Sequence, residues 1–109
     1  MNAIILAGGQ GSRLAPWHAP KSLLPVNGVT ILQRLMDSLM GDLENKTINK
    51  IIICTGYRSG DIEASTYEHG WMVELGHVMF SDAGEHTPMG QRLLTARPLT
   101  DGGRVLVCY

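Results

Sequence analysis

The chain has 109 residues, 44% of them hydrophobic, and a formal net charge of −1 at pH 7, which is typical of one small globular domain. This charge balance lacks the basic excess of a nucleic-acid-binding protein, so nucleic acid is not an expected partner. The longest apolar runs, residues 3–7 and 51–54, are far shorter than the roughly 20 residues that span a bilayer, so no membrane partner is expected either. The amino terminus has no cationic start of a signal peptide, and we therefore expect a cytoplasmic location.

Residues 2–7 predict a central strand buried on both faces, because the apolar run is continuous rather than alternating. Residues 8–28 predict a long loop, which in a compact domain usually serves function. A helix is expected to begin at Thr30, which has capping-box spacing to Gln33, and to stop at Gly41. Its apolar side chains recur at helical spacing: Ile31, Leu32, Leu35, Met36, Leu39 and Met40.

The middle of the chain predicts one further strand and a weaker helix. Residues 51–55 are a second buried strand. Residues 60–68 predict a helix anchored by Ile62 and Tyr67, which Gly70 ends. The following residues, 71–81, contain β-forming residues broken by Gly76, and they predict either one irregular strand near residues 77–81 or a small hairpin.

The last third of the chain predicts a helix and a final strand. Thr87 and Pro88 have the pattern of a helix start, an N-cap hydroxyl followed by proline at the first helical position, and Pro98 ends the helix. Residues 105–108 are a last strand. Three residues of the helix are expected to face the sheet: Leu93, Leu94 and Ala96. The alternation of strands and helices predicts an α/β fold, a Rossmann-like three-layer α/β/α unit with a mainly parallel sheet.

Cys54 and Cys108 fall in strands that we predict to lie in the interior. Free cysteine is among the most buried residue types, so both are expected to be buried thiols. A disulfide is disfavoured in the cytoplasm, and no Cys/His spacing indicates a zinc site. No residue of the chain is therefore assigned to a metal.

A glycine-rich segment after the first strand carries the strongest functional signal. Gly8, Gly9 and Gly11 fall within four positions, and glycine lets a ligand approach the main chain without a Cβ in the way. Successive N–H groups at the carboxyl end of a strand can hold a phosphate. Arg13 could donate two parallel hydrogen bonds to the phosphate, and Lys21 could place a second positive charge beside the same anion. The pattern predicts a nucleoside triphosphate site.

Two better-known glycine motifs do not fit. The dinucleotide pattern G-x-G-x-x-G needs a glycine where Leu14 stands, which argues against a simple NAD or FAD site. The P-loop pattern finds only Lys21 and Ser22, preceded by Pro20, which has no N–H to donate to a phosphate.

Residues 6–14 match the pattern L-A-G-G-x-G-[ST]-R-L, followed by Pro16 and by Pro20-Lys21. This resembles the nucleotidyltransferases that make activated sugars, the sugar-1-phosphate pyrophosphorylases, and their phosphocholine-type relatives. The resemblance continues more loosely through residues 24–28 and 51–57. The interval between Pro16 and Pro20 is shorter than in many sugar-specific members, which leaves the acceptor open.

The resemblance implies a nucleotide-diphospho-sugar transferase-like fold and transfer of a nucleotidyl group from an NTP to a phosphorylated acceptor, such as a sugar 1-phosphate, with release of pyrophosphate. Arg13 would grip the β- and γ-phosphates, and Lys21 would reach the α-phosphate or the acceptor phosphate; these two are the implied catalytic residues. Nucleotide contacts are implied for these two and for Leu6, Ala7, Gly8, Gly9, Gly11, Ser12 and Gly90, the last beside the base.

The resemblance also implies Mg²⁺ as a cofactor, held by an aspartate of a Gly-Asp step that would follow Tyr109. Residues 1–109 are therefore expected to be the N-terminal, nucleotide-binding portion of a truncated nucleotidyltransferase domain. Two alternatives stay open: a non-catalytic nucleotide-binding or regulatory module, and cytidylyl or guanylyl transfer of a molybdopterin or isoprenoid type. The base, the acceptor and the oligomeric state are not predicted.

Overall fold

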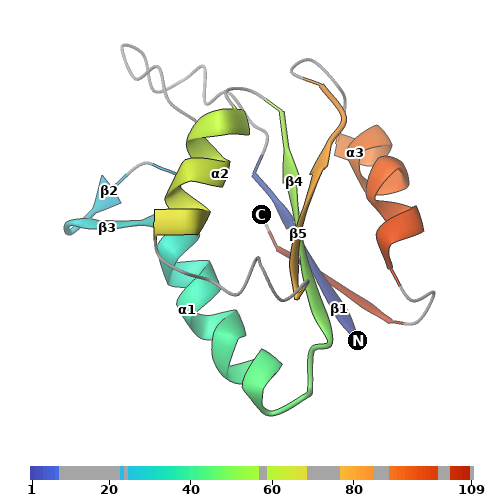
Figure 1. Ribbon diagram of the computed structural model, residues 1–109, viewed down its shortest axis with the longest axis horizontal. Helices are drawn as coiled ribbons and strands as arrows, with labels where there is room; N and C mark the ends of the chain where they lie inside the picture. The colour runs from blue at the N-terminus through green and yellow to red at the C-terminus, as the bar shows by residue number, and fades with distance from the viewer. Residues whose placement is uncertain are drawn as a thin grey trace.

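The fold is organised around a parallel β-sheet with helices on both faces (Figure 1). The computed structural model describes residues 1–7, 23, 25–56, 59–68, 77–84, 89–100 and 104–108. Within these residues the main sheet has four strands in the order β5-β4-β1-β6, all paired in parallel. Their bounds are Asn2–Leu6 for β1, Lys50–Thr55 for β4, Val78–Asp82 for β5 and Val105–Cys108 for β6.

The interior position of β1 and β4 follows from their composition. Ile4 of β1 lies opposite Ile52 of β4, and both side chains are buried. A strand covered on both faces needs apolar residues at consecutive positions, which is the pattern seen in both segments. The predictions of a central strand at residues 2–7 and a second buried strand at 51–55 are confirmed to within a residue at their ends.

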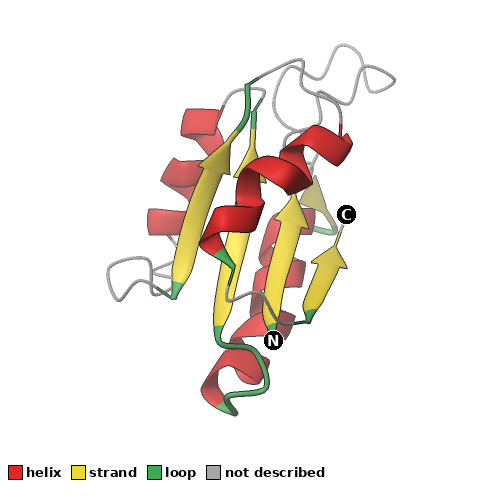
Figure 2. Cartoon of the chain, turned by 90° about the vertical axis from the view of Figure 1, so that its right-hand side faces the viewer, coloured by secondary structure: helices red, strands yellow, loops and turns green. Residues whose placement is uncertain are grey.

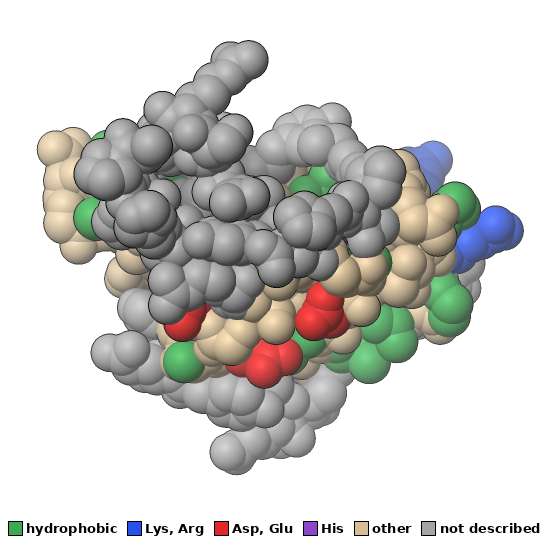
Figure 3. All heavy atoms as spheres, turned by 90° about the horizontal axis from the view of Figure 1, so that it is seen from above, with side chains coloured by type: hydrophobic (Ala, Val, Ile, Leu, Met, Phe, Trp, Pro, Cys, Tyr) green, Lys and Arg blue, Asp and Glu red, His purple; other side chains and the backbone are tan. Residues whose placement is uncertain are grey.

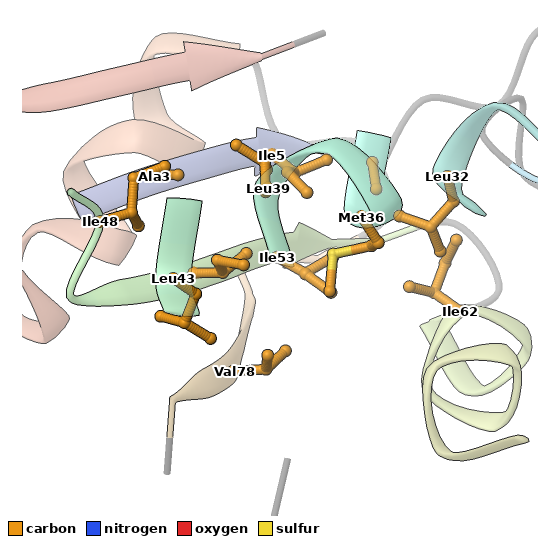
Figure 4. Close-up of a cluster of buried hydrophobic side chains, with 12 residues drawn as sticks. Ala3, Ile5, Leu32, Met36, Leu39, Leu43, Ile48, Ile53, Ile62 and Val78 are labelled. Atoms are coloured by element: carbon orange, nitrogen blue, oxygen red, sulfur yellow. The ribbon is translucent and has the colours of Figure 1, made fainter. Parts of the chain in front are cut away.

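Helices α1 (Ile31–Glu44) and α2 (Ser59–Glu68) cover one face of the sheet, and α3 (Met89–Ala96) covers the other (Figures 1 and 2). Alternate residues of the central strands point to opposite faces, so the core divides into two clusters. The larger cluster lies under α1 and α2 and is shown in Figure 4; it includes Ala3, Ile5, Leu32, Met36, Leu39, Ile53 and Ile62. The smaller cluster lies under α3 and consists of Ile4, Ile52, Cys54 and Ala96, with Leu6, Leu93 and Leu99 packed against it. The predicted three-layer α/β/α architecture is confirmed.

Helix α1 begins as predicted but ends later. The Thr30 side chain accepts a hydrogen bond from the Gln33 N–H at 3.0 Å, so the predicted N-cap is confirmed. The prediction that Gly41 stops the helix is wrong, because the helix continues to Glu44. Leu43 lies one turn beyond Leu39 and is buried against the sheet, and burying a leucine contributes about 1.5–3 kcal/mol. This exceeds the roughly 1 kcal/mol that a glycine costs within a helix.

The predicted loop 8–28 is wrong at its end, where a hairpin of β2 (Pro25–Val26) and β3 (Val29–Thr30) forms. Asn27 and Gly28 have φ of 55° and 81°, the two positive values that a two-residue type I′ turn requires. The Arg34 side chain donates to the Val26 carbonyl oxygen at 2.9 Å, which holds this hairpin against α1.

Helix α3 differs from its prediction at one position. Leu93 and Ala96 pack on the sheet as expected, but Leu94 is 58% exposed, so its predicted contact with the sheet is wrong. The α-helix ends at Ala96 and passes into a short 3-10 turn, η4 (Arg97–Leu99), that contains Pro98. The side chain of Tyr67 and the residues Gly70, Thr87 and Pro88 lie outside the described residues.

Strands β5 and β6 are the outer strands of the four-stranded sheet. β5 is a parallel strand at Val78–Asp82, which agrees with the strand expected near residues 77–81, whereas residues 71–76, where the other arm of a hairpin would stand, lie outside the described residues. β6 pairs only with β1 among the described strands and forms an edge, so Cys108 is half-buried and its predicted interior position is wrong. Cys54 is buried, as expected. Val105, Leu106 and Val107 of β6 are 37–40% exposed.

None of the helices in the described part of the chain has the length and apolar character that crossing a membrane would demand.

Candidate functional site

The carboxyl ends of the parallel strands meet at one edge of the sheet (Figure 2). In open α/β sheets this edge is where ligands bind, because the loops that follow the strands surround a crevice there. The described residues at this edge include the last residues of the strands, Leu6, Thr55, Asp82 and Cys108, and those that follow them, Ala7, Gly56, Ala83 and Gly84. The glycine-rich motif leaves β1 at the same edge.

Three of the predicted site residues fall in the described part of the chain. Leu6 packs against the core cluster under α3, and Ala7 is buried, its N–H donating to the Cys54 carbonyl oxygen at 2.9 Å. The strand pairing thus extends one residue past β1 and brings the motif to the edge of the sheet beside β4. Gly90 is exposed in the first turn of α3. The other predicted site residues lie outside the described residues: Gly8, Gly9, Gly11, Ser12, Arg13 and Lys21.

Arg92 is the residue at this edge that sequence reasoning missed. It lies in α3 and is only 7% exposed, and its Nη1 donates to the Thr55 carbonyl oxygen at 2.9 Å. Its own carbonyl oxygen accepts a long contact from the Cys54 Sγ at 3.9 Å. The sequence contained a signal for the burial of Arg92, since this residue stands one helical turn before Ala96, on the helix face that packs on the sheet.

The segments that follow β4 and β5 meet beside this arginine. A Cβ added at Gly56 would overlap Nη1 of Arg92 and lie 2.7 Å from the Gly84 carbonyl oxygen. The Gly84 N–H donates to the Asp82 Oδ1 at 2.9 Å, and Gly84 itself has φ of 100°. Glycine is therefore required at position 56 by close packing and at position 84 by backbone conformation.

Burial acts on both thiols in the same direction. Burial raises the pKa of Cys54, and the nearby Arg92 guanidinium offsets this only in part. Burial also raises the pKa of Cys108. A raised pKa keeps a thiol protonated, and the thiol form is a poor nucleophile and metal ligand.

The described side chains do not form a metal site. They contain no group of three or more His, Cys, Asp and Glu residues that could hold an ion. The Asp82 carboxylate at the carboxyl edge accepts a hydrogen bond from its own turn. The aspartate expected to hold Mg²⁺ would follow Tyr109, so that expectation does not concern the described side chains, and no chemical step is assigned to the metal.

Figure 3 views the molecule from the carboxyl edge of the sheet. The described acidic side chains visible there lie close to one another, while the visible lysine and arginine side chains gather at one end of the view.

A family model for the MobA-like NTP transferase domain matches residues 3–108. The chain therefore belongs to the MobA-like NTP transferase domain family, and the nucleotidyltransferase resemblance and the fold class expected from the sequence are confirmed.

Three relatives illustrate the similarity. The bifunctional protein GlmU of Methanocaldococcus jannaschii is 30% identical over 103 residues, which cover 93% of this chain and 22% of the relative. The glucose-1-phosphate adenylyltransferase of Acidothermus cellulolyticus is 37% identical over 62 residues, 55% of this chain and 14% of that protein. The crystal structure of HddC from Yersinia pseudotuberculosis, complexed with GMP-PN, is similar with a TM-score of 0.72 and 26% identity, over 97% of this chain and 45% of that one. The chain thus spans less than half the length of these relatives.

Proposed function

We propose that this chain supplies the NTP-binding half of an enzyme that transfers a nucleotidyl group from an NTP to a phosphorylated acceptor and releases pyrophosphate. The observation that carries the proposal is that the motif at residues 6–14 begins at Leu6, the last residue of the central strand β1, at the carboxyl edge of a parallel sheet. The chain also matches an NTP transferase family over residues 3–108. A sugar 1-phosphate is the proposed acceptor, because one similar protein is a glucose-1-phosphate adenylyltransferase.

In the proposed reaction a phosphate oxygen of the acceptor attacks the α-phosphorus of the NTP in line. A new P–O bond forms, the bond from the α-phosphorus to the β-phosphate oxygen breaks, and the electron pair leaves with pyrophosphate. The protein contributes mainly alignment and neutralisation of the developing charge. The proposed roles are main-chain contacts to the nucleotide from residues 6–12, charge stabilisation of the departing pyrophosphate by Arg13, and contact of Lys21 with the α-phosphate or the acceptor phosphate.

Gly90 is proposed to stand beside the base. It lies in the first turn of α3, which packs on the face of the sheet opposite α1 and α2, and its Cβ position is open to solvent. The amino end of a helix also presents free N–H groups toward the same edge of the sheet. GMP-PN in the HddC structure supports nucleotide binding by this fold at 26% identity.

The proposal is tested by measuring pyrophosphate release by the full-length protein with each of the four NTPs against a panel of phosphorylated acceptors. The panel includes sugar 1-phosphates, a molybdopterin-type phosphate, an isoprenoid precursor phosphate and phosphocholine. We expect one NTP and one acceptor to stand out. Binding of an NTP with no turnover on any acceptor would indicate the non-catalytic module instead, and absence of NTP binding would refute the proposal.

A further inference from the structure

Arg92 occupies a position where an apolar side chain would be expected. Its helix α3 packs on Ile52 and Cys54 through Leu93 and Ala96, and Arg92 stands on this same buried side. Burying a guanidinium removes it from water at a considerable cost, which specific hydrogen bonds must offset. One such bond is made to main chain: Nη1 donates to the carbonyl oxygen of Thr55, the last residue of β4, at 2.9 Å.

The guanidinium lies close to Gly56, which also packs closely against the turn after β5. Gly56, just after β4, leaves no room for a Cβ, because Arg92 Nη2 would lie 2.8 Å away and the Gly84 carbonyl oxygen 2.7 Å away. Gly84 belongs to the turn after β5, which is itself fixed by the hydrogen bond to Asp82. The guanidinium therefore lies where the segment after β4 and the segment after β5 come together.

We propose that Arg92 is a positioning residue for the nucleotide. It acts through Thr55 by fixing the end of β4, and with it Gly56, beside the turn after β5, and so sets the position of the main chain at the carboxyl edge of the sheet. This inference rests on the proposed function, since it takes the nucleotide to bind at that edge. Arg92 does not itself need to touch the ligand. Displacing such a support by about 1 Å can lower a rate on the order of 100-fold.

The test compares four variants of the full-length protein with the wild type. Arg92→Met removes the donor but keeps an apolar stem, and Arg92→Lys keeps a charge with a different reach. Gly56→Ala keeps the arginine at position 92 but adds a Cβ that would displace its guanidinium and the Gly84 carbonyl oxygen. The matched control is Arg97→Met, because Arg97 is an exposed arginine of the adjoining turn η4. For each protein, NTP affinity is measured by titration calorimetry, kcat and KM by pyrophosphate release, and the folded fraction by circular dichroism.

We expect Arg92→Met and Gly56→Ala to weaken kcat/KM for the NTP about 100-fold at an unchanged folded fraction. Arg92→Lys should recover part of this loss, and Arg97→Met should equal the wild type. If Arg92→Met does not fold, Arg92→Lys and Gly56→Ala decide the question. Wild-type kinetics in these folded variants, or losses no larger than the unfolded fraction, overturn the role of Arg92 alone. Failure of the wild type to bind any NTP overturns the proposed function, and this inference with it.

Discussion

Two glycines of this chain should respond in opposite directions to the same substitution. Gly56 stands where an added Cβ would lie 2.7 Å from the Gly84 carbonyl oxygen, and that backbone atom cannot move without shifting the turn after β5. Gly41 stands on the exposed face of α1, and an added Cβ there would meet nothing within 4 Å. Both residues become alanine, so the chemistry of the change is identical and only the surroundings differ.

The magnitudes follow from these surroundings. Inserting a methyl group into closely packed structure costs about 1–3 kcal/mol, so Gly56→Ala should lower the free energy of unfolding by that amount. Replacing an exposed glycine within a helix by alanine gains about 0.5–1 kcal/mol, so Gly41→Ala should raise it. The two variants should therefore differ by about 1.5–4 kcal/mol, the sum of these two estimates.

Urea denaturation of the full-length protein, followed by circular dichroism, measures both values on one scale. Similar m-values for the two variants and the wild type would show that the difference lies in stability rather than in the extent of unfolding. The double variant should show the sum of the two effects, because the sites share no partner. A Gly56→Ala protein as stable as the wild type would contradict the close packing of the segments after β4 and β5.

Three further predictions concern other parts of the molecule. Arg13→Ala should lower the rate of pyrophosphate release by about two to three orders of magnitude with little change in the unfolding midpoint, and Arg13→Lys should also be poor because an ammonium offers no two-pronged contact; a normal rate in Arg13→Ala would defeat the assigned role. Thr30→Ala removes the acceptor of the Gln33 N–H and should lower the free energy of unfolding in urea by about 1 kcal/mol, whereas an unchanged midpoint would mean that the cap contributes nothing. Alkylation by iodoacetamide, followed by mass spectrometry, should be slow at Cys54 at neutral pH and rise only well into the alkaline range, because a raised pKa leaves less thiolate; rapid labelling of Cys54 in the folded protein would contradict its burial.

Local sequence was sufficient for much of the fold. The continuous apolar runs of β1 and β4 predicted strands buried on both faces, and both were placed within a residue of their ends. The similar run of β6 did not show that this strand lies at an edge, with its side chains partly exposed. The start of α1 could be predicted because an N-cap depends on residues three positions apart. The hairpin of β2 and β3 was missed although its signal was present, since Asn27-Gly28 is a common type I′ turn pair.

The family could also be predicted from the sequence, because the motif at residues 6–14 is a short contiguous pattern whose spacing is set by what binds it. The roles assigned to Arg13, Lys21 and the neighbouring glycines stay predictions. They depend on a ligand and on the geometry of residues outside the described part of the chain.

Other features were decided by contacts between distant segments. Gly41 lies within α1 because Leu43 reaches the sheet, and Leu94 is exposed because α3 turns a different side toward Ile52. Arg92 and Gly56 are 36 positions apart in the chain, and they come close together only once α3 has packed on β4. A sequence pattern reports the preferences of neighbouring residues, whereas the space available to a side chain is set by whichever elements surround it after folding.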